Sequence, residues 1–427
     1  MNNIPWKNIT LLWFSLSVLL PQGVGIAHPF GLPSLDLPRI STILLFITFC
    51  MYLVVKRPSI ASVLGERFKT RQFLAFIIIM ISVSAIFSES PGASFLWVIG
   101  DTFLFFGFAF ITLFILSEEG CTKHEFITTL LVIGTILILW TSIELILQEN
   151  LILNRPTWDK SVTDIFLHLK RFWLMPVGPY GYVQSLALAL ALFGPVFLVL
   201  GAQYNRYFKM FFSILFIVVL FATQCVSAIM AAFAFAFAIV IVMTYKSTSK
   251  LGWWLIGILM LMLYLIAVFF PISNDYFSWI HFATYLVDGR GSFGARFDNN
   301  LALFQHMFYA GNWFLGYGPG SLMDLGRVVT SVYDGGWDIR TDPGSVFIWF
   351  IESGIVVGSL ILYMMVMAIV KGLKATDAPT QGLTIGLIGF FTIALSSQSP
   401  YLWGVALVYI GMIEVWTMDA SGEGNLN

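Results

Sequence analysis

The sequence predicts an all-α protein that crosses a membrane many times. Of its 427 residues, 58% are hydrophobic and 11% are charged, whereas roughly 25% of the residues in a soluble domain are charged. Apolar runs recur along most of the chain at the length of about 20 residues that a spanning helix needs. Backbone groups in lipid must be hydrogen-bonded within their own segment, so we expect these runs to be helices. The composition excludes a soluble globular protein.

Twelve apolar runs are candidate spans. They lie near 9–27, 39–55, 72–88, 94–116, 126–147, 178–201, 208–223, 225–243, 252–271, 345–370, 381–397 and 400–417. The chain then divides into helices 1–9 over 1–271, a large loop over 272–344, helices 10–12 over 345–417 and a tail over 418–427.

The first run is expected to be a span rather than a cleaved signal, because it contains Pro21 and Gly23 and lacks a clear small-residue cleavage site. The three cysteines are scattered and indicate neither a disulfide framework nor a metal site.

The positive charges predict an orientation. Lys and Arg accumulate on the cytoplasmic side of short loops, and an inside N-terminus puts 13 of the 22 positive residues inside. The inside set has nine Lys and four Arg, and the outside set has seven Arg and two Lys. The planar fork of Arg matches phosphate oxygens, whereas Lys is a point charge. The bias towards Arg in the outside set indicates that the outer face binds a phosphate-bearing group. The alternative is a chance difference between small numbers.

The large loop, Ser273 to Gly344, is the strongest candidate for a site. It holds four Arg, no Lys, seven Asp, no Glu, eleven Gly and fifteen aromatic residues. Residues 295–314 predict an amphipathic helix, with Leu301, Phe304 and Phe308 on one face. A glycine-rich run, 316–320, follows; it is not a nucleotide loop because no Gly-Lys-Ser/Thr follows it. The aromatic, Asp, Asn and Arg side chains are typical of a carbohydrate-binding surface, with interfacial anchoring as the alternative for the aromatics.

Polar residues elsewhere add to this picture. Lys170-Arg171-Phe172-Trp173 closes the second outer segment, and 178–182 begins the sixth run with Gly and Pro, which indicates irregular backbone lining a cavity. Asp101, Glu144 and Glu352 are ionisable residues within spans. Such residues are costly in a membrane, and for Asp101 and Glu144 a hydrogen bond to a neighbouring helix is the preferred interpretation. No pair of His or Cys has zinc spacing, and no serine-hydrolase motif occurs.

Several short stretches resemble the O-antigen polymerase and ligase superfamily. They are Gly289-Arg290, Ala295-Arg296-Phe297, Leu315-Gly316-Tyr317-Gly318, Glu352 to Gly358, and Arg171 with Gly178 to Ser185. The many spans and the large loop before the last three resemble this superfamily over the whole chain. Ligases of the superfamily carry a histidine where the helix after the large loop begins; here the sequence is Thr341-Asp342-Pro343-Gly344, which is more similar to the polymerases.

The resemblance implies a glycosyltransferase with a GT-C-like helical fold. It implies action on undecaprenyl-pyrophosphate-linked oligosaccharides at the periplasmic face of the bacterial inner membrane. The distribution of positive charge over twelve spans predicts that both termini are cytoplasmic. We expect Arg290 and Arg296 to stabilise the leaving pyrophosphate and Asp342 to orient or deprotonate the acceptor. The expected substrate-binding residues are Arg171, Tyr180, Tyr182, Tyr317, Arg327, Trp337 and Arg340.

No cofactor or metal is required by this chemistry, and no nucleic-acid partner is expected. The expected partners are the lipid-linked oligosaccharide, membrane lipid and a chain-length regulator protein. A ligase that transfers the polymer to lipid A–core is one alternative. A flippase or other transporter is the other, although the sequence has no convincing internal repeat and few charges near the midplane of the spans.

Overall fold

The computed structural model describes most of the helical part of the chain. The described residues are 4–21, 25–26, 35–65, 69–147, 149–151, 176, 178–180, 183–199, 206–223, 231–232, 234–240, 303–321, 345–395 and 402–420. They form helices, turns and one short antiparallel strand pair, in which β1 (Gly25–Ile26) pairs with β2 (Leu35–Asp36). The predicted all-α class is confirmed for this part of the chain.

The first half begins with a series of long helices separated by short turns. In chain order these are α1 (Trp6–Leu19), α2 (Leu37–Lys56), α3 (Ile60–Leu64), α4 (Lys69–Ile86), α5 (Pro91–Trp97), the π-helix η2 (Val98–Gly107), α6 (Phe108–Glu118) and α7 (Lys123–Leu147). The second part contains the 3₁₀ turn η4 (Gly178–Tyr180), α8 (Val183–Val199), α9 (Arg206–Ala222), α15 (Ser345–Lys374), α16 (Ala378–Ala394) and α17 (Trp403–Ala420).

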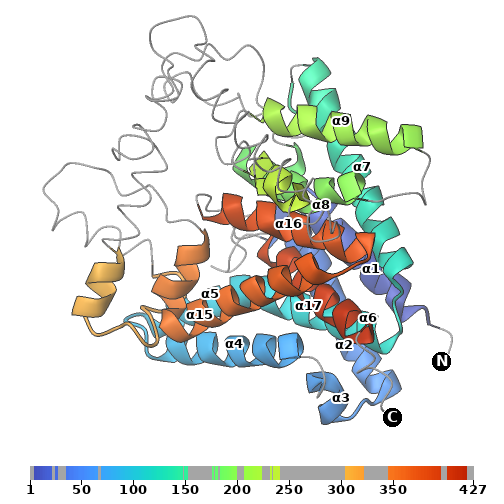
Figure 1. Ribbon diagram of the computed structural model, residues 1–427. Helices are drawn as coiled ribbons and strands as arrows, with labels where there is room; N and C mark the ends of the chain where they lie inside the picture. The colour runs from blue at the N-terminus through green and yellow to red at the C-terminus, as the bar shows by residue number, and fades with distance from the viewer. Residues whose placement is uncertain are drawn as a thin grey trace, which may run out of the picture.

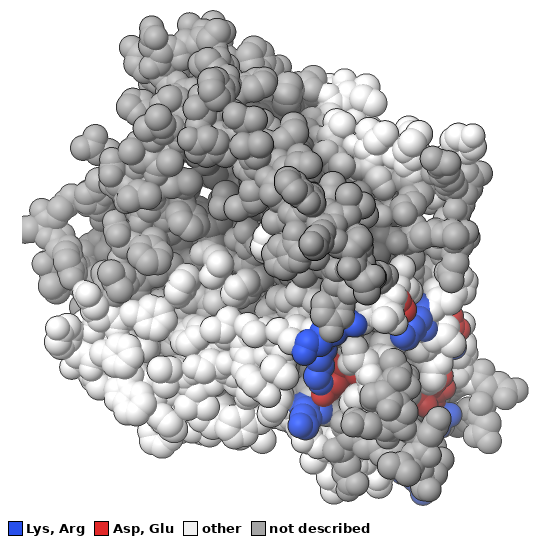
Figure 2. Space-filling model, viewed as in Figure 1, with Lys and Arg blue, Asp and Glu red and all other residues white. Residues whose placement is uncertain are grey.

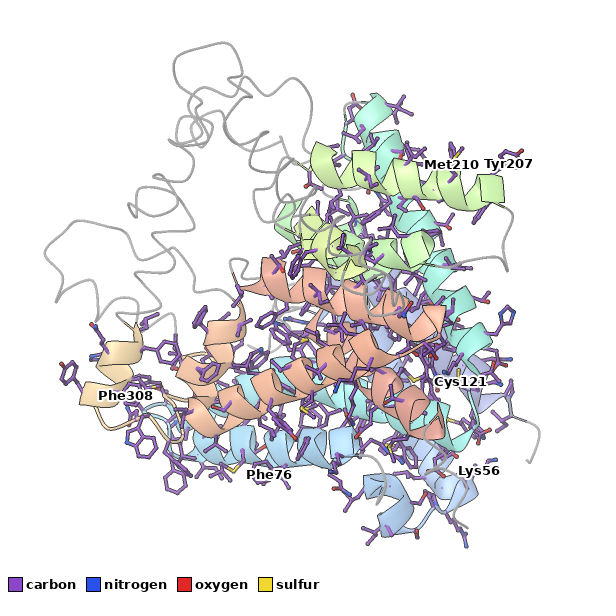
Figure 3. All side chains as sticks on the ribbon, in the orientation of Figure 1. Lys56, Phe76, Cys121, Tyr207, Met210 and Phe308 are labelled. Atoms are coloured by element: carbon purple, nitrogen blue, oxygen red, sulfur yellow. The ribbon has the colours of Figure 1, made fainter. Side chains whose placement is uncertain are left out.

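Five described helical segments are long and apolar enough to cross a membrane: α2, α4, the continuous α5–η2–α6 segment Pro91–Glu118, α7 and α15. Shorter apolar segments lie within α8, α9, α16 and α17. Large apolar side chains on the outside of the bundle, including Phe76, Met210 and Phe308, point away from it (Figure 3). Exposed apolar surface of this extent is what a bilayer covers. The chain is a membrane protein.

The first predicted span differs from the structure. Expected over 9–27, the helix α1 runs over Trp6–Leu19 instead, and the chain returns through the β1–β2 pair. Pro21 explains the early end, because proline has no backbone N–H to continue the helical hydrogen bonding.

The amphipathic helix expected over 295–314 is also shorter in the described part. Residues 303–309 are helical and 310–315 form turns, in which Gly311 has a φ of 76°. Leu303 and Met307 are buried and Phe304 is partly buried, whereas Phe308 is 52% exposed and so does not share the packed face.

The helices lie side by side in successive rows. From the bottom of Figure 1 upward, α4, α15, α16, α8 and α9 each contact the next. Helix α17 lies behind them against α15, α16, α6 and η2, and residues 402–414 of this helix segment are all buried. Helices α8 and α16 cross closely, and a Cβ on Gly386 would lie 2.7 Å from the carbonyl oxygen of Leu192.

One end of the bundle carries a group of ion pairs, which we call the charged end. Three acidic residues at the end of α6, just after it and in the first turn of α7 pair with basic residues from three other helices; they are Glu118, Glu119 and Glu125. The pairs are Lys7–Glu125 (2.5 Å), Lys56–Glu119 (3.1 Å) and Arg71–Glu118 (3.7 Å), and Lys123–Asp377 (3.4 Å) adds a contact to α16. Figure 2 shows the charged side chains of this face gathered at the lower right.

Candidate functional site

A break in α15 forms the most unusual backbone arrangement in the described structure. At Gly354 the backbone has φ 80° and ψ 174°, which is not helical. The last turn of α15, with Lys371 and Lys374, lies at the charged end, so the break at Gly354 lies towards the opposite end of the bundle. Backbone groups at a break need other partners, because an unpaired group costs several kcal/mol in lipid.

A turn from the large loop supplies those partners. The backbone N–H groups of Tyr317 and Gly318 donate to the carbonyl oxygens of Ile351 (3.0 Å) and Glu352 (2.9 Å). On the other side of the break, the N–H of Ile355 donates to the carbonyl oxygen of Trp313 (2.9 Å). We call this arrangement of 313–320 and 351–355 the turn–helix junction.

Helix α4 contributes the third part of the junction. The buried hydroxyl of Ser84 lies 2.5 Å from the carbonyl oxygen of Leu315 and 3.0 Å from that of Glu352. Its single hydrogen is therefore shared between one carbonyl oxygen from the turn and one from α15. Ser84 fixes both segments to a helix that begins at the charged end with Lys69.

Two glycines allow the turn to approach α15 this closely. A Cβ on Gly354 would lie 2.0 Å from the carbonyl oxygen of Phe314, and one on Gly316 would lie 2.5 Å from the carbonyl carbon of Glu352. Both residues have positive φ, 80° and 75°, which glycine adopts without a Cβ penalty.

The carboxylate of Glu352 completes the junction. Its Oε1 accepts a hydrogen bond from the backbone N–H of Gly320 (3.0 Å), so the acidic side chain holds the end of the glycine-rich turn. The sequence singled out Glu352 as an ionisable residue within a span and as the first residue of a stretch that resembles the superfamily. The partner of the carboxylate could not be predicted from either property.

Tyr317 lies in the junction with its ring packed. The ring is 5% exposed and joins Leu303, Met307 and Ile351 in a small apolar cluster. The His306 ring stacks on it, with centroids 5.8 Å apart and planes 6° apart. Burial, together with the nearby charge of Glu89, raises the pKa of the Tyr317 hydroxyl. The phenol is therefore neutral at physiological pH, and its hydroxyl oxygen is buried like the ring.

Tyr180 lies in η4, beside α7 and α8. It is 1% exposed, and its hydroxyl has no hydrogen-bond partner in the part of the chain that the structure describes. The adjacent Gly178 N–H donates to Glu144 Oε2 (2.9 Å), and Glu144 Oε1 accepts from the Trp140 indole (3.1 Å) and the Leu151 N–H (3.3 Å). The fully buried Glu144 carboxylate thus holds the chain where it returns to the bundle, in agreement with the hydrogen-bonding interpretation.

The other expected site residues lie outside the described residues. These are Arg171, Tyr182, Arg290, Arg296, Arg327, Trp337, Arg340 and Asp342. Of the expected residues, the structure therefore describes Tyr317 at the turn–helix junction and Tyr180 at the contact of η4 with α7 and α8. Within the described ranges, no group of three or more His, Cys, Asp or Glu side chains is arranged to hold a metal ion.

Comparison with known proteins does not assign the chain to a family: no family model matches it, and no curated protein matches it.

Proposed function

We propose that this protein is a surface-polysaccharide polymerase, of the O-antigen type, in the bacterial inner membrane. It joins undecaprenyl-pyrophosphate-linked repeat units at the periplasmic face. The observation that carries the proposal is the turn–helix junction. Two stretches that resemble the polymerase and ligase superfamily, Leu315 to Gly318 and Glu352 to Gly358, are directly hydrogen-bonded there although they are far apart in sequence.

The proposed topology has twelve spans in a GT-C-like arrangement, with both termini in the cytoplasm. The ion-paired charged end supports this orientation, because Lys7, Lys56, Arg71 and Lys123 all belong to the set that the distribution of positive charge assigns to the inside. The turn–helix junction, near the opposite ends of α4 and α15, then faces the periplasm.

The proposed reaction takes its energy from the pyrophosphate link. A hydroxyl of the acceptor repeat unit attacks the anomeric carbon of the donor sugar, a new C–O bond forms, and the bond from that carbon to the pyrophosphate oxygen breaks. Asp342 takes the hydroxyl proton, and the lipid pyrophosphate leaves with the electron pair. Arg290 and Arg296 stabilise the charge on the leaving oxygen, an effect that contributes roughly 3–4 kcal/mol per donor in other enzymes.

The junction has a positioning role in this proposal. The turn separates two parts of the large loop, one with Arg290 and Arg296 and the other with Arg327, Arg340 and Asp342. Its hydrogen bonds to α15 and α4 anchor both parts to helices, and a rigid support of this kind is what preorganised charge stabilisation requires.

A deletion strain tests the function directly. We expect lipopolysaccharide that carries a single repeat unit and no longer chains on a gel. Loss of all capping, with polymer retained on the lipid carrier, would indicate a ligase instead. Failure of lipid-linked units to reach the periplasm would indicate a flippase.

Complementation of that strain tests the residues. Arg296→Lys keeps the charge and removes the bidentate fork, so we expect at least a tenfold loss of long chains at equal protein level. Arg57→Lys is the matched control, because Arg57 is an exposed residue at the last turn of α2. A normal ladder from Arg296→Lys would exclude the bidentate role, and a fully active Asp342→Asn would exclude the base.

A further inference from the structure

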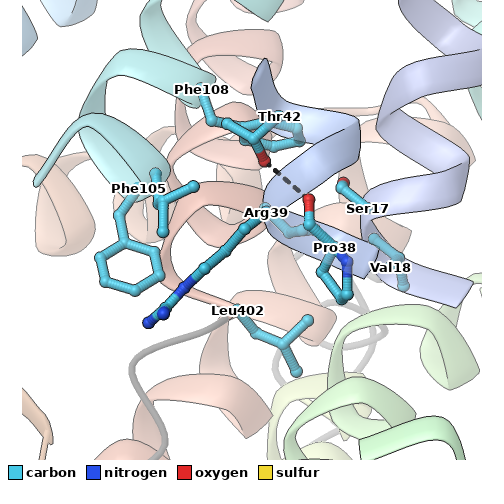
Figure 4. A pocket seen from close by; sticks show the side chains of 10 residues that line it. Ser17, Val18, Pro38, Arg39, Thr42, Phe105, Phe108 and Leu402 are labelled. Carbon is cyan, nitrogen blue, oxygen red and sulfur yellow. Dashed lines mark hydrogen bonds between the residues drawn. The ribbon is translucent and has the colours of Figure 1, made fainter. Parts of the chain in front are cut away.

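The interior of the described bundle leaves little room for a ligand. The cavity in Figure 4 lies among α1, α2, η2 and α17, and its volume is about 30 Å³. One enclosed water needs ~10–15 Å³ on this measure, so the cavity has room for about two waters. Arg39, which lines it, lies with its Nε 4.0 Å from Asp36 Oδ1, so its charge is compensated. A larger contact must use the surface of the described part.

Exposed aromatic side chains gather on two segments that meet at the turn–helix junction. Segment 303–321 supplies Phe308, Tyr309, Trp313 and Phe314, which are 52%, 91%, 44% and 48% exposed. The connection that follows α4 supplies Phe87, which is 73% exposed. We call these five residues the aromatic rim. Figure 3 shows Phe308 at the outer edge of the molecule, beyond the end of α4.

The junction lies level with the end of a membrane span. Helix α4 is long and apolar enough to cross a membrane, and the next such segment begins at Pro91. Ser84, which donates to the carbonyl oxygen of Leu315, lies two residues before the end of α4, a rise of about 3 Å along the helix axis. A Cβ on Gly318 would lie 2.3 Å from the Cβ of Ser88, so the turn also contacts the connection between the two spans. The turn therefore lies at the boundary of the bilayer.

The composition of this part of the loop favours lipid over a protein partner. Residues 299–323 contain no Asp, Glu, Lys or Arg, although the large loop contains seven Asp and four Arg. A protein interface has a polar rim, whereas Trp and Tyr rings are enriched at the level of the lipid head groups. The aromatic rim also continues the exposed apolar surface of α4, where Phe76 and Ile79 are 43% and 59% exposed.

We propose that 303–321 is a re-entrant segment of the large loop, with the aromatic rim in the head-group region of the bilayer. The partner of this surface is the membrane, at the end of the bundle opposite the charged end. The segment thereby fixes the height of the large loop relative to the bilayer. This contact with lipid does not rest on the proposed function, and only its assignment to the periplasmic leaflet rests on the proposed orientation.

A depth measurement by site-directed spin labelling tests the proposal. The three cysteines of the full-length protein, Cys50, Cys121 and Cys225, are replaced by serine. The Tyr309→Cys variant is then spin-labelled and reconstituted into nanodiscs of phosphatidylcholine and phosphatidylglycerol. Electron paramagnetic resonance measures how often the label collides with oxygen, which concentrates in lipid, and with a water-soluble nickel chelate.

Two reference positions calibrate the depth. Ile79→Cys puts the label on the exposed side of α4, five residues before Ser84 and deeper in the span. Thr376→Cys puts it in the exposed turn between α15 and α16, at the charged end. We expect the label at position 309 to collide with the nickel chelate at least threefold less often than the label at position 376. Its ratio of oxygen to nickel collisions should lie between the ratios of the two reference positions.

Three results would overturn the proposal. Nickel collisions at position 309 as frequent as at position 376 would place the rim in water. A collision ratio equal to that at position 79 would place it in the hydrocarbon core and not among the head groups. Protection from both reagents would show that protein covers the rim. Phe308→Cys is the second labelled variant, and it replaces Tyr309→Cys if that protein elutes differently from the wild type on size exclusion.

This proposal and the polymerase function fail separately. A normal ladder in the deletion strain would reject the polymerase without changing the depth of the label. A label in water would reject the membrane contact without changing the ladder of the deletion strain.

Discussion

Replacing Gly354 by alanine tests the turn–helix junction most directly. The added Cβ would lie 2.0 Å from the carbonyl oxygen and 2.5 Å from the carbonyl carbon of Phe314, where ordinary contact begins near 3.4 Å. These are backbone atoms, so a rotamer change cannot relieve the clash. The turn must retreat by more than about 1 Å, or α15 must close its break.

The cost follows from the contacts that this retreat removes. Holding a non-glycine residue at this φ and ψ costs of order 1–3 kcal/mol. Retreat also breaks the hydrogen bonds Tyr317 N–H to Ile351 and Ile355 N–H to Trp313, at 3.0 and 2.9 Å, each with a net contribution of about 0.5–1.5 kcal/mol. The sum is about 2–6 kcal/mol, which is a large part of the stability of a typical domain.

The assay is the thermal unfolding midpoint of the protein purified in detergent, together with the polysaccharide ladder in the complemented deletion strain. Gly92→Ala is the matched control, because Gly92 is within α5 and a Cβ there meets no atom within 4 Å. We expect the control to be neutral or up to about 1 kcal/mol more stable from helix propensity. A Gly354→Ala protein with the midpoint and ladder of this control would refute the junction as described.

Two further predictions concern buried polar groups. Glu144→Ala leaves the Gly178 N–H and the Trp140 indole without their acceptor, so the thermal unfolding midpoint should fall by the equivalent of about 2–6 kcal/mol. Glu144→Gln keeps one acceptor oxygen, so its thermal midpoint should fall less. An equal fall in the two variants would contradict the role of Glu144 as a hydrogen-bond acceptor. Burial raises the pKa of the Cys121 thiol to about 11 from an ordinary 9.0. The thiolate is the reactive form of cysteine. A protein with Cys121 as its sole cysteine should therefore be alkylated at pH 8 about a hundredfold more slowly than an ordinary exposed thiol, and the rate should rise about tenfold per pH unit. An alkylation rate equal to that of a cysteine in a free peptide would disprove this.

The sequence was most informative where one physical constraint dominates. Length and hydropathy predicted α2, α4, α7 and α15 to within a few residues, because lipid requires long apolar segments with internal hydrogen bonds. The π-helical stretch Val98–Gly107 within the fourth predicted span was not predictable, since a π-helix and an α-helix can share the same apolar pattern.

The site was less predictable because its decisive contacts are long-range. The motif of Gly354 was recognised as part of a resemblance, but its role depends on the carbonyl of Phe314, which a sequence cannot place. Ser84 carries no local signal, and only the packing of α4 against distant segments reveals it. Tyr317 was expected to bind substrate, and that role stays a prediction; its stacking with His306 could not be read from the sequence.

The hydrogen bonds at the break in α15 also divide the large loop into two parts. Because 303–321 packs against α15 and α4, this anchor divides the loop sequence into two stretches, 273–302 and 322–344. The entropy of closing a loop grows only with the logarithm of its length, so we expect a change in the length of either stretch to cost little while the anchor is kept. Under the proposed function, specificity for a new repeat unit can then evolve by exchanging one stretch while the central anchor stays constant.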